Sequence, residues 1–419
     1  MNTPASTYVD HGTGHVIVVH AWQDQYAHYD SYLDHSSRPV TYITNPTGRE
    51  SIPDRAAEVV VLPRTTDPAE LRRATYQLSE RHGEPSAIIA LKENHLPTVS
   101  RLREELGAAG PYAADLAPFL DKDLMTRLVE SIGLPVPAYA PVSTNADIIE
   151  FGRRHGWPVV TKPLRGSASE GVSRVPGEDA AAELTWDRPI MVQRFQAGDI
   201  YHVDGYWTGS ELGPWRMSRY VSSLFSFRHR QSPAGAVEVD DPGTLAAMDD
   251  YLQELIPGMC ESAWVFHLEV FGDGNSTRPS EFVFLEVGRR VGGAEIPFLW
   301  REVHQVDLMA IECAIQTGNP VPRLDVADPG VMAGWLLCPV PARRPCRVTS
   351  SNSMMHIPAV YGERVLEPGA VIPDAEAFYE HVGGRFRFRA GSTKEVTDSI
   401  DSVIKEFHIN CEPLPKERS

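Results

Sequence analysis

Four short runs of β-branched residues, spaced regularly through the start of the chain, constrain its fold most strongly. Between the last two, the apolar spacing of DPAELRRATYQLSER predicts an amphipathic helix that begins at Asp67. Strands that alternate with helices favour parallel βαβ units. We therefore expect an α/β protein whose N-terminal part is a doubly wound sheet. The four expected strands are HVIVV at 15–19, VTYIT at 40–44, EVVVLP at 58–63 and SAIIAL at 86–91.

Charge and composition exclude several classes of function. The 419 residues include 39 Lys+Arg and 56 Asp+Glu, a formal net charge of −17 at pH 7. Because binding to a phosphate backbone needs a basic face, we expect no nucleic-acid partner, although one small anion can bind in a locally basic pocket. The most apolar stretch, 331–340, is far shorter than the roughly 20 residues that span a bilayer. The N-terminus lacks the pattern of a signal peptide.

The cysteines indicate a reducing environment. There are five of them, and none forms a CxxC pair. Reduced thiols are then the default, and a disulfide framework or structural zinc site is not expected. We predict a cytoplasmic protein with small-molecule partners and no membrane contact. The oligomeric state stays open, with a homodimer as the commonest alternative.

The centre of the chain predicts a second group of elements. DKDLMTRLVESIG at 121–133 is typical of a helix that ends at a glycine. The stretch 156–175 predicts two strands joined by a glycine- and serine-rich turn, and PIMVQRF at 189–195 predicts another strand. SAWVFHLEVF at 262–271 and EFVFLEV at 281–287 predict a hairpin with a long loop.

The last part of the chain mixes one predicted helix with short strands. A helix near 301–317 leads into GWLLCPV and RFRFRA, which are typical of strands among scattered Gly and Pro. A helix at 393–407 closes this small β-rich part.

Three isolated features are compatible with nucleotide binding. Lys162 precedes RGSASEG, and the backbone N–H groups of such a loop can surround phosphate oxygens while a lysine supplies charge. The spacing is not that of a Walker A loop, and a hairpin turn with an exposed lysine explains it equally well. Lys122 can be a solvated lysine at a helix start. Gln193 can read an adenine edge or be an edge glutamine beside a core Phe195.

Two glutamates give the strongest chemical signal. Glu269 and Glu286 each lie in the middle of an apolar predicted strand, where a carboxylate is unfavourable unless it is paired or bound to a metal. In a hairpin the two can stand side by side as hard oxygen ligands for Mg²⁺. The alternative is that both form salt bridges with the arginines at 289–290 and bind no metal.

The motifs DK…GLPVP, VVTKPLRGSASEGV, IMVQRFQAGD, HLEVF and LEVGRRVGGAEIP occur in an order that resembles the ATP-grasp superfamily. Within it, the chain is most similar to carboxylate–amine ligases that include the bacterial L-amino-acid ligases. The motifs cover roughly 112–325, and the flanks fit by pattern only. The resemblance implies a Rossmann-like domain at 1–115, an ATP-grasp domain at 116–325 with a lid at about 121–195, and a β-rich segment at 326–419 packed on this core.

The resemblance also implies a role for each matching residue. Lys122 and Lys162 would contact the phosphates of ATP, with Lys162 also near the adenine. Glu269 and Glu286 would hold one or two Mg²⁺ ions, and Arg290 would stabilise the transferred phosphate and the tetrahedral intermediate. The remaining implied contacts to ATP come from the loop that would close over the phosphates and from the adenine pocket: Gly166, Ser167, Ser169, Gly171, Gln193, Arg194 and Phe195.

The chain departs from the family pattern at three positions. The acidic residue that usually holds the ribose falls at Ile200, and Asp199 beside it is the substitute. The Asn that usually follows the second metal-binding Glu is Gly288, and Gln193 stands where the family usually has Glu.

The implied reaction joins a carboxylate and an amine through an acyl phosphate, with release of ADP and phosphate. The substrates would be an amino acid or another small acid in specialised metabolism. His229 and His267 are candidate bases, and Arg228, His229, Arg290 and Gly293 are candidate substrate contacts. The alternatives are a ligase that acts on a peptide or carrier-bound substrate, and a degenerate nucleotide-binding protein.

Overall fold

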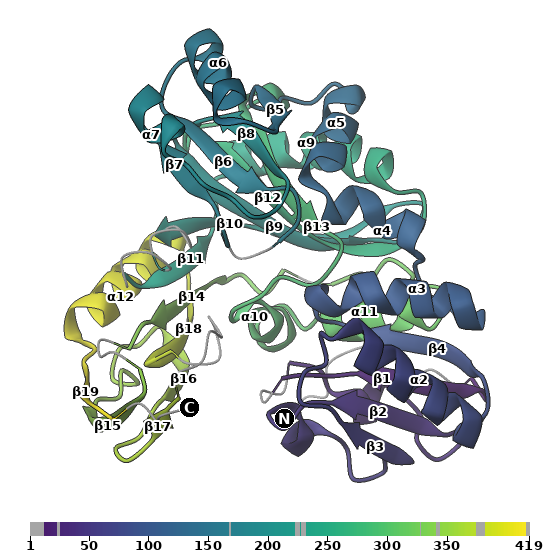
Figure 1. Ribbon diagram of the computed structural model, residues 1–419. Coiled ribbons are helices and arrows are strands. Elements are labelled where there is room, and N and C mark those ends of the chain that lie inside the picture. Colours follow the sequence, from purple (N-terminus) through teal and green to yellow (C-terminus); the bar gives the residue numbers. More distant parts are fainter. Residues whose placement is uncertain are drawn as a thin grey trace.

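The structure is a computed structural model of the chain (Figure 1). Predicted site residues Ser167, Arg228 and His229 lie outside the part of the chain that it describes. The described residues are 12–22, 26–166, 169–222, 227, 232–326, 328–340, 344–373 and 382–415.

The N-terminal part is a four-stranded sheet in which every neighbouring pair is parallel. This confirms the predicted α/β class with parallel strands. All four predicted strands are present. In spatial order they are β3 (Glu58–Val61), β2 (Val40–Thr44), β1 (His15–Val19) and β4 (Pro85–Ala90).

The one helix that the sequence predicts in this part begins at the expected residue. Helix α2 (Pro68–His82) begins after Asp67, whose carboxylate accepts the N–H groups of Ala69 and Glu70. A buried face of leucines packs it on the sheet. The other helical segments before residue 121 are α1 (Tyr29–Tyr32), η1 (Gly48–Ser51), η2 (Glu93–His95), α3 (Leu96–Leu106) and α4 (Ala113–Leu120).

A second, antiparallel sheet has the order β5-β8-β6-β7. Its pairing confirms the strand–turn–strand prediction for 156–175. Helix α5 (Lys122–Ile132) begins at the Asp121 cap and ends at Gly133, as predicted. The elements of this sheet and its covering helices are β5 (Tyr139–Val142), α6 (Asn145–His155), β6 (Val159–Pro163), β7 (Ser173–Val175), α7 (Glu178–Ala182) and β8 (Ile190–Arg194).

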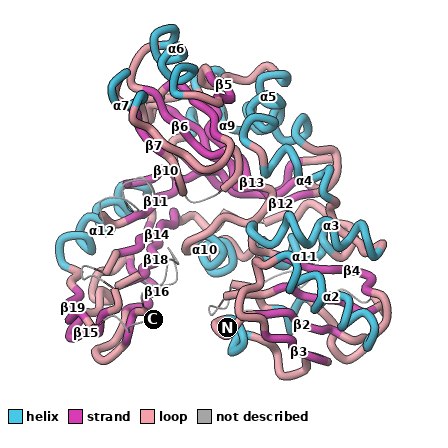
Figure 2. The backbone as a smooth tube through the Cα atoms, in the orientation of Figure 1, coloured by secondary structure: helices cyan, strands magenta, loops and turns pink. Residues whose placement is uncertain are grey.

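The third sheet, called the central sheet below, has eight strands. It extends from β12 and β13 in the upper part of the view to β18 and β16 at the lower left (Figure 2). The predicted hairpin is present as its edge. Strands from the final segment continue the sheet by pairing with β11, so this segment is joined to the centre by backbone hydrogen bonds. In spatial order the strands are β13 (Val283–Gly288), β12 (Trp264–Gly272), β9 (Asp199–Trp207), β10 (Leu212–Ser222), β11 (Ala234–Glu238), β14 (Met332–Cys338), β18 (Gly384–Ala390) and β16 (Val360–Val365).

Helix α9 (Pro242–Met259) decides which side chains of this sheet are available for chemistry. It packs on one face, where Tyr201, Val203, Leu268 and Val287 are buried with it. Because side chains alternate along a strand, the residues between them point to the opposite face. The side chains of His202, Asp204, His267, Glu269 and Glu286 lie on that second face, whereas Asp199 alternates in step with Tyr201 and does not.

The final segment is as β-rich as predicted, and α12 (Thr393–Glu406) matches the expected closing helix. A small sheet of β17 (Val371–Ile372), β15 (Cys346–Ser351) and β19 (Ile409–Pro413) completes it. The five cysteines are free thiols. Among the described residues, no helix is long and apolar enough to cross a membrane. The domain boundaries at 115/116 and 325/326 stay predictions.

The single helix predicted near 301–317 is wrong. The structure has two helices, α10 (Ile296–Glu302) and α11 (Leu308–Gln316). Asp307 has extended backbone angles, and its carboxylate accepts the N–H groups of Met309 and Ala310. This cap starts a new helix, because it satisfies N–H groups that a continuous helix would bond internally.

Helix α11 joins the N-terminal sheet to the central one, since it contacts both β4 and β12. At its end the buried Gln316 amide makes two hydrogen bonds to the backbone of Ala90, 2.8 and 2.9 Å long. The buried Arg103 guanidinium donates to the same Gln316 side chain. These bonds fix the end of β4, and therefore the residues that follow it, against the central sheet.

Candidate active site

One cavity of about 670 Å³ collects most of the residues that the sequence singles out. It is bordered by Lys122 at the start of α5, by Lys162 on β6, by the hairpin glutamates and by the segment that follows β4. Asp199 and Gly171 are not among its lining residues. The predicted site residues that line it are Lys122, Lys162, Gly166, Ser169, Gln193, Arg194, Phe195, Glu269, Glu286, Arg290 and Gly293.

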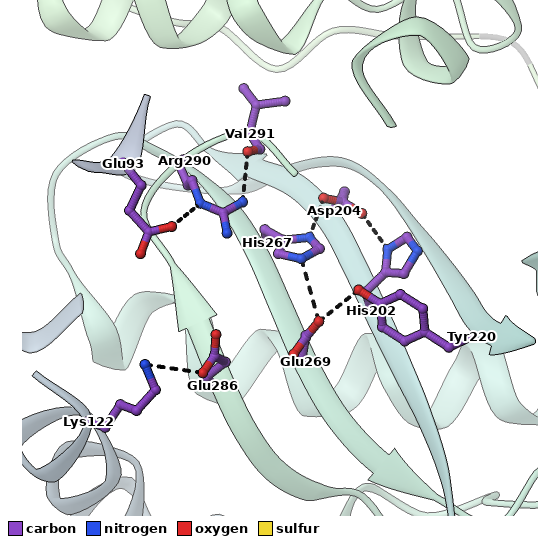
Figure 3. Close-up of polar contacts among 10 residues, drawn as sticks. All are labelled: Glu93, Lys122, His202, Asp204, Tyr220, His267, Glu269, Glu286, Arg290 and Val291. Carbon is purple, nitrogen blue, oxygen red and sulfur yellow. Dashed lines mark hydrogen bonds and ion pairs between the residues drawn. The ribbon is translucent and has the colours of Figure 1, made fainter. Parts of the chain in front are cut away.

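Glu269 and Glu286 are direct partners in the β12–β13 register. They stand side by side on the face opposite α9, as the hairpin predicted. Tyr220 donates its hydroxyl to Glu269 Oε1 at 2.7 Å, and Lys122 Nζ lies 3.4 Å from Glu286 Oε2 (Figure 3). The alternative of salt bridges to both arginines at 289–290 is not favoured, because Arg289 donates instead to Ser262 and the Ala263 carbonyl.

The two carboxyl groups differ in their electrostatics. Burial and the neighbouring charge of Glu286 raise the pKa of Glu269. Burial also disfavours the charge of Glu286, but Lys122, Lys162 and Arg290 together hold its pKa below the usual value. A bound cation would relieve the repulsion between the two carboxylates, as metal sites built from paired acids do.

Two lysines face these glutamates from the other side of the cavity. Lys122 is the first residue of α5, and its ammonium donates to the Gly166 carbonyl at 2.7 Å. Lys162 is only 4% exposed, and among the described residues its Nζ has no hydrogen-bond partner. Burial lowers the pKa of Lys162 to about 8, while the charge of Glu286 opposes that shift. A buried ammonium without a partner is a site prepared for an anionic ligand.

The strand end of β8 forms a slot with apolar walls. Gln193 is 4% exposed and its Nε2 has no hydrogen-bond partner within the described ranges. Arg174 stacks over the Phe195 ring at 5.1 Å. Val160, Leu285 and Phe271 also border the cavity here. An amide beside apolar walls suits a planar base with polar edges.

Asp199, the residue expected to contact the ribose, lies outside the region around Gln193 and Phe195. Asp199 is half exposed and lies 3.6 Å from Arg219, whereas Ile200 lines the cavity. No acidic side chain at 199–200 therefore borders the cavity.

The N-terminal sheet contributes one site residue that sequence reasoning missed. Glu93 follows β4 and accepts a hydrogen bond from Arg290 Nε at 2.5 Å. Residues at the carboxyl ends of parallel strands commonly form binding sites. The place of Glu93 just after a predicted parallel strand was therefore the sequence feature that could have identified it. Arg290 Nη1 also donates to the Val291 carbonyl at 3.0 Å.

Sequence reasoning also missed His202 and Asp204, which form a buried cluster with His267 on β9 and β12. Asp204 accepts hydrogen bonds from the Nδ1 atoms of His202 and His267, at 2.7 and 2.8 Å (Figure 3). Burial disfavours the Asp204 charge, but the two imidazoles lower its pKa below the usual value. Gly292 packs directly against Asp204, since an added Cβ at Gly292 would lie 2.4 Å from Asp204 Oδ1. A period-two pattern of polar residues in DIYHVDGYW was the only sequence signal.

Solved structures place this arrangement in a known fold. The crystal structure of an L-amino acid ligase from Bacillus licheniformis matches with a TM-score of 0.70 at 16% identity, over 95% of this chain and 98% of that one. The biotin carboxylase domain of Hydrogenobacter thermophilus 2-oxoglutarate carboxylase, in complex with MgADP, ADP and bicarbonate, matches with a TM-score of 0.65 at 14% identity, over 96% and 92%. At these identities the likeness shows the fold alone, and it is the predicted ATP-grasp fold.

Curated relatives are similar to part of the chain. The L-arginine-specific L-amino acid ligase of Bacillus subtilis is 23% identical over 227 residues, 50% of this chain and 52% of the relative. A D-alanine–D-alanine ligase of Mycolicibacterium gilvum is 30% identical over 217 residues, 46% of this chain and 58% of the relative. The chain thus spans little more than half the length of these relatives. No family model matches it.

Proposed function

We propose that this protein is an ATP-dependent carboxylate–amine ligase that forms an amide bond through an acyl phosphate and releases ADP and phosphate. One observation carries the proposal: the paired carboxylates Glu269 and Glu286 share a single cavity with Lys122, Lys162 and Arg290. Phosphoryl transfer depends on positioning and charge neutralisation, and it needs no nucleophilic side chain.

Two buried polar atoms in the cavity are suitable hydrogen-bond donors to ATP. Lys162 Nζ and Gln193 Nε2 both lack a hydrogen-bond partner in the described part of the chain, and both residues line the cavity. Leaving a buried donor unsatisfied is unfavourable by about 1–3 kcal/mol. A nucleotide whose phosphate meets Lys162 and whose base meets Gln193 would satisfy both donors at once. Lys122 and the backbone at Gly166 and Ser169 would complete the phosphate side.

The residues also fit a divalent cation. Glu269 and Glu286 are register partners on one sheet face, and the raised pKa of Glu269 reflects burial and the neighbouring charge of Glu286. These two carboxylates would hold Mg²⁺, which would neutralise the phosphate charge of ATP when bound. Hard carboxylate oxygens are the ligands that this ion prefers.

The residues of the chain itself would then have separate roles in the reaction. Lys122 and Lys162 would draw the γ-phosphate toward the substrate carboxylate, whose oxygen attacks phosphorus and displaces ADP. Arg290, held by Glu93 and the Val291 carbonyl, would face the acyl phosphate and the oxyanion that forms when the amine attacks. The backbone of Gly293 would lie beside the same substrate.

Two features support small substrates. The relatives that match this chain are named as ligases of amino acids, and the described cavity volume, about 670 Å³, suits a nucleotide with small co-substrates. We therefore propose an amino acid or another small acid as the carboxylate and a small amine as its partner.

Product analysis tests the proposal. The protein would be incubated with ATP, Mg²⁺ and mixtures of amino acids, and the nucleotide products would be separated. We expect ADP and phosphate, formed only when a carboxylate is present. AMP and pyrophosphate would indicate an adenylating reaction and refute the acyl-phosphate mechanism. ATP binding without carboxylate-dependent turnover across a broad acid panel would refute the ligase assignment.

A further inference from the structure

Three neighbouring strands place five side chains of metal-binding type on one face, in two adjacent rows. In the first row, Glu269 pairs with His202 on β9 and with Glu286 on β13. In the second row, His267 pairs with Asp204 on β9 and with Gly288 on β13. Residues two apart on a strand share a face, so both rows lie on the cavity side of the sheet. Gly288 has no side chain, and Arg290 packs over it, with its Cγ, Nε and Cζ atoms 3.3, 3.5 and 3.6 Å from the place of a Cβ.

Asp204 fixes the orientation of both histidine rings. Its side chain is 1% exposed, and its two oxygens are each bonded to one Nδ1 atom. A carboxylate only accepts hydrogen bonds, so both Nδ1 atoms carry the proton in the neutral rings. The Nε2 atoms are then left with lone pairs. A carboxylate that orients a histidine in this way is the usual partner of a metal-binding imidazole.

Only one of the two rings reaches the candidate metal site. His267 lines the cavity, and its Nε2 lies 3.8 Å from Glu269 Oε1 (Figure 3). His202 is not among the lining residues, although its Nε2 is buried and has no hydrogen-bond partner in the described residues. Two atoms that each lie about 2.1 Å from one metal are at most about 4.2 Å apart. The separation between His267 and Glu269 is within this limit.

We infer that His267 Nε2 is a third protein ligand of the divalent cation held by Glu269 and Glu286, with Asp204 as the positioning residue that orients it. This inference rests on the proposed function for the two glutamates. A nitrogen ligand shifts the preference of an oxygen site from Mg²⁺ toward first-row transition metals. The site is therefore expected to bind Mn²⁺ more tightly than Mg²⁺, with a nitrogen in direct contact with the metal.

The test uses Mn²⁺ as the probe and the full chain without nucleotide. The free-ion electron paramagnetic resonance signal gives the affinity, and electron spin-echo modulation reports ¹⁴N bound to the metal. We expect ¹⁴N modulation in the unaltered protein, which changes when the protein is labelled with ¹⁵N-histidine. His267→Gln should abolish it and weaken Mn²⁺ binding by a factor on the order of 10 to 100. Asp204→Asn should weaken binding about tenfold.

His202→Gln is the matched control, because His202 bonds to the same Asp204 but does not line the cavity. Its ¹⁴N signal should persist. Bound Mn²⁺ without nitrogen modulation, a signal that survives His267→Gln, or no Mn²⁺ binding would each overturn the inference. The labelled, unaltered protein decides the question even if a variant fails to fold. Carboxylate-dependent ADP formation with nitrogen-free Mn²⁺ would remove this inference alone. Nitrogen-bound Mn²⁺ in a protein that turns over no ATP would instead remove the proposed function.

Discussion

Arg290 and Glu93 form an ion pair between the central sheet and the N-terminal sheet, with Arg290 Nε 2.5 Å from Glu93 Oε2. The two residues are 197 positions apart in the chain. The pair fixes a guanidinium beside the glutamate hairpin, at the place where we propose that the acyl phosphate forms. The N-terminal part of the chain therefore contributes directly to the site.

Glu93→Gln tests whether this pair positions Arg290 for chemistry. The amide keeps the shape but removes the charge that holds the guanidinium, so kcat is expected to fall by about 10- to 100-fold. Binding of ADP should change little, because Glu93 lies with Arg290 and not with the two lysines. Glu84→Gln, at an exposed glutamate of the same part, serves as the control. Equal kcat values for Glu93→Gln and the unaltered protein would contradict the positioning role.

Glu286→Gln tests the metal assignment. The change removes one proposed cation ligand and the partner of Lys122, so turnover of ATP should fall by at least about 100-fold. The fold should be retained, since the side chain is only partly buried, and circular dichroism checks this. Glu254→Gln, on the exposed side of α9, is the matched control. Unchanged ATP turnover in Glu286→Gln would contradict the assignment of Glu286 as a metal ligand.

Lys162→Met should stabilise the nucleotide-free protein while it removes nucleotide binding. The buried ammonium has a pKa of about 8, against 10.5 for an ordinary lysine. This difference lowers the free energy of unfolding by about 3 kcal/mol at pH 7. Methionine fills a similar volume without a charge. Thermal melting should show a higher midpoint and no further rise on addition of ADP. Lys122→Met should not stabilise, because Lys122 already has partners in Gly166 and Glu286. A lower midpoint for Lys162→Met would contradict this account.

The same lysine predicts a pH dependence. Its pKa in the folded protein is below that in the unfolded chain, so its unfavourable effect is complete below about pH 8 and disappears as the pH rises toward 10.5. The stability gained by Lys162→Met should therefore be largest near pH 7 and become small near pH 10. Denaturant unfolding of both proteins across this range measures the difference. A gain that does not change with pH would show that the ammonium is not responsible.

Gly292→Ala and Gly293→Ala form a matched pair of variants. A Cβ at Gly292 would lie 2.4 Å from Asp204 Oδ1 and 2.9 Å from His267 Nδ1, whereas nothing lies within 4 Å of a Cβ at Gly293. We expect Gly292→Ala to lower the unfolding free energy by about 1–3 kcal/mol and Gly293→Ala to leave it nearly unchanged. Equal unfolding free energies for the two variants would contradict the tight packing over Asp204.

The sequence predicted the elements whose signals are local. The β-branched strands, the helix that begins at Asp67, the helix predicted at 121–133 and the antiparallel hairpin all depend on residues close together in the chain. The hairpin also predicted the pairing of Glu269 with Glu286, because alternation and a single turn determine which side chains meet.

The missed residues depend on contacts between distant segments. Asp204 meets His267 because β9 pairs with β12, and no pattern within either strand determines that register. Glu93 and Arg290 are 197 positions apart, and Gln316 and Arg103 hold the end of β4, just before Glu93, against α11. The break between α10 and α11 was missed because Asp307 resembles an ordinary helix residue until its side chain caps the next turn.

Isotope transfer tests the central claim most directly. A substrate acid labelled with ¹⁸O in its carboxylate would be turned over with ATP and an amine, and the phosphate analysed by ³¹P nuclear magnetic resonance. Attack of the carboxylate on the γ-phosphate predicts one ¹⁸O in each phosphate released, together with ADP. Unlabelled phosphate, or label found in AMP, would contradict the acyl-phosphate mechanism.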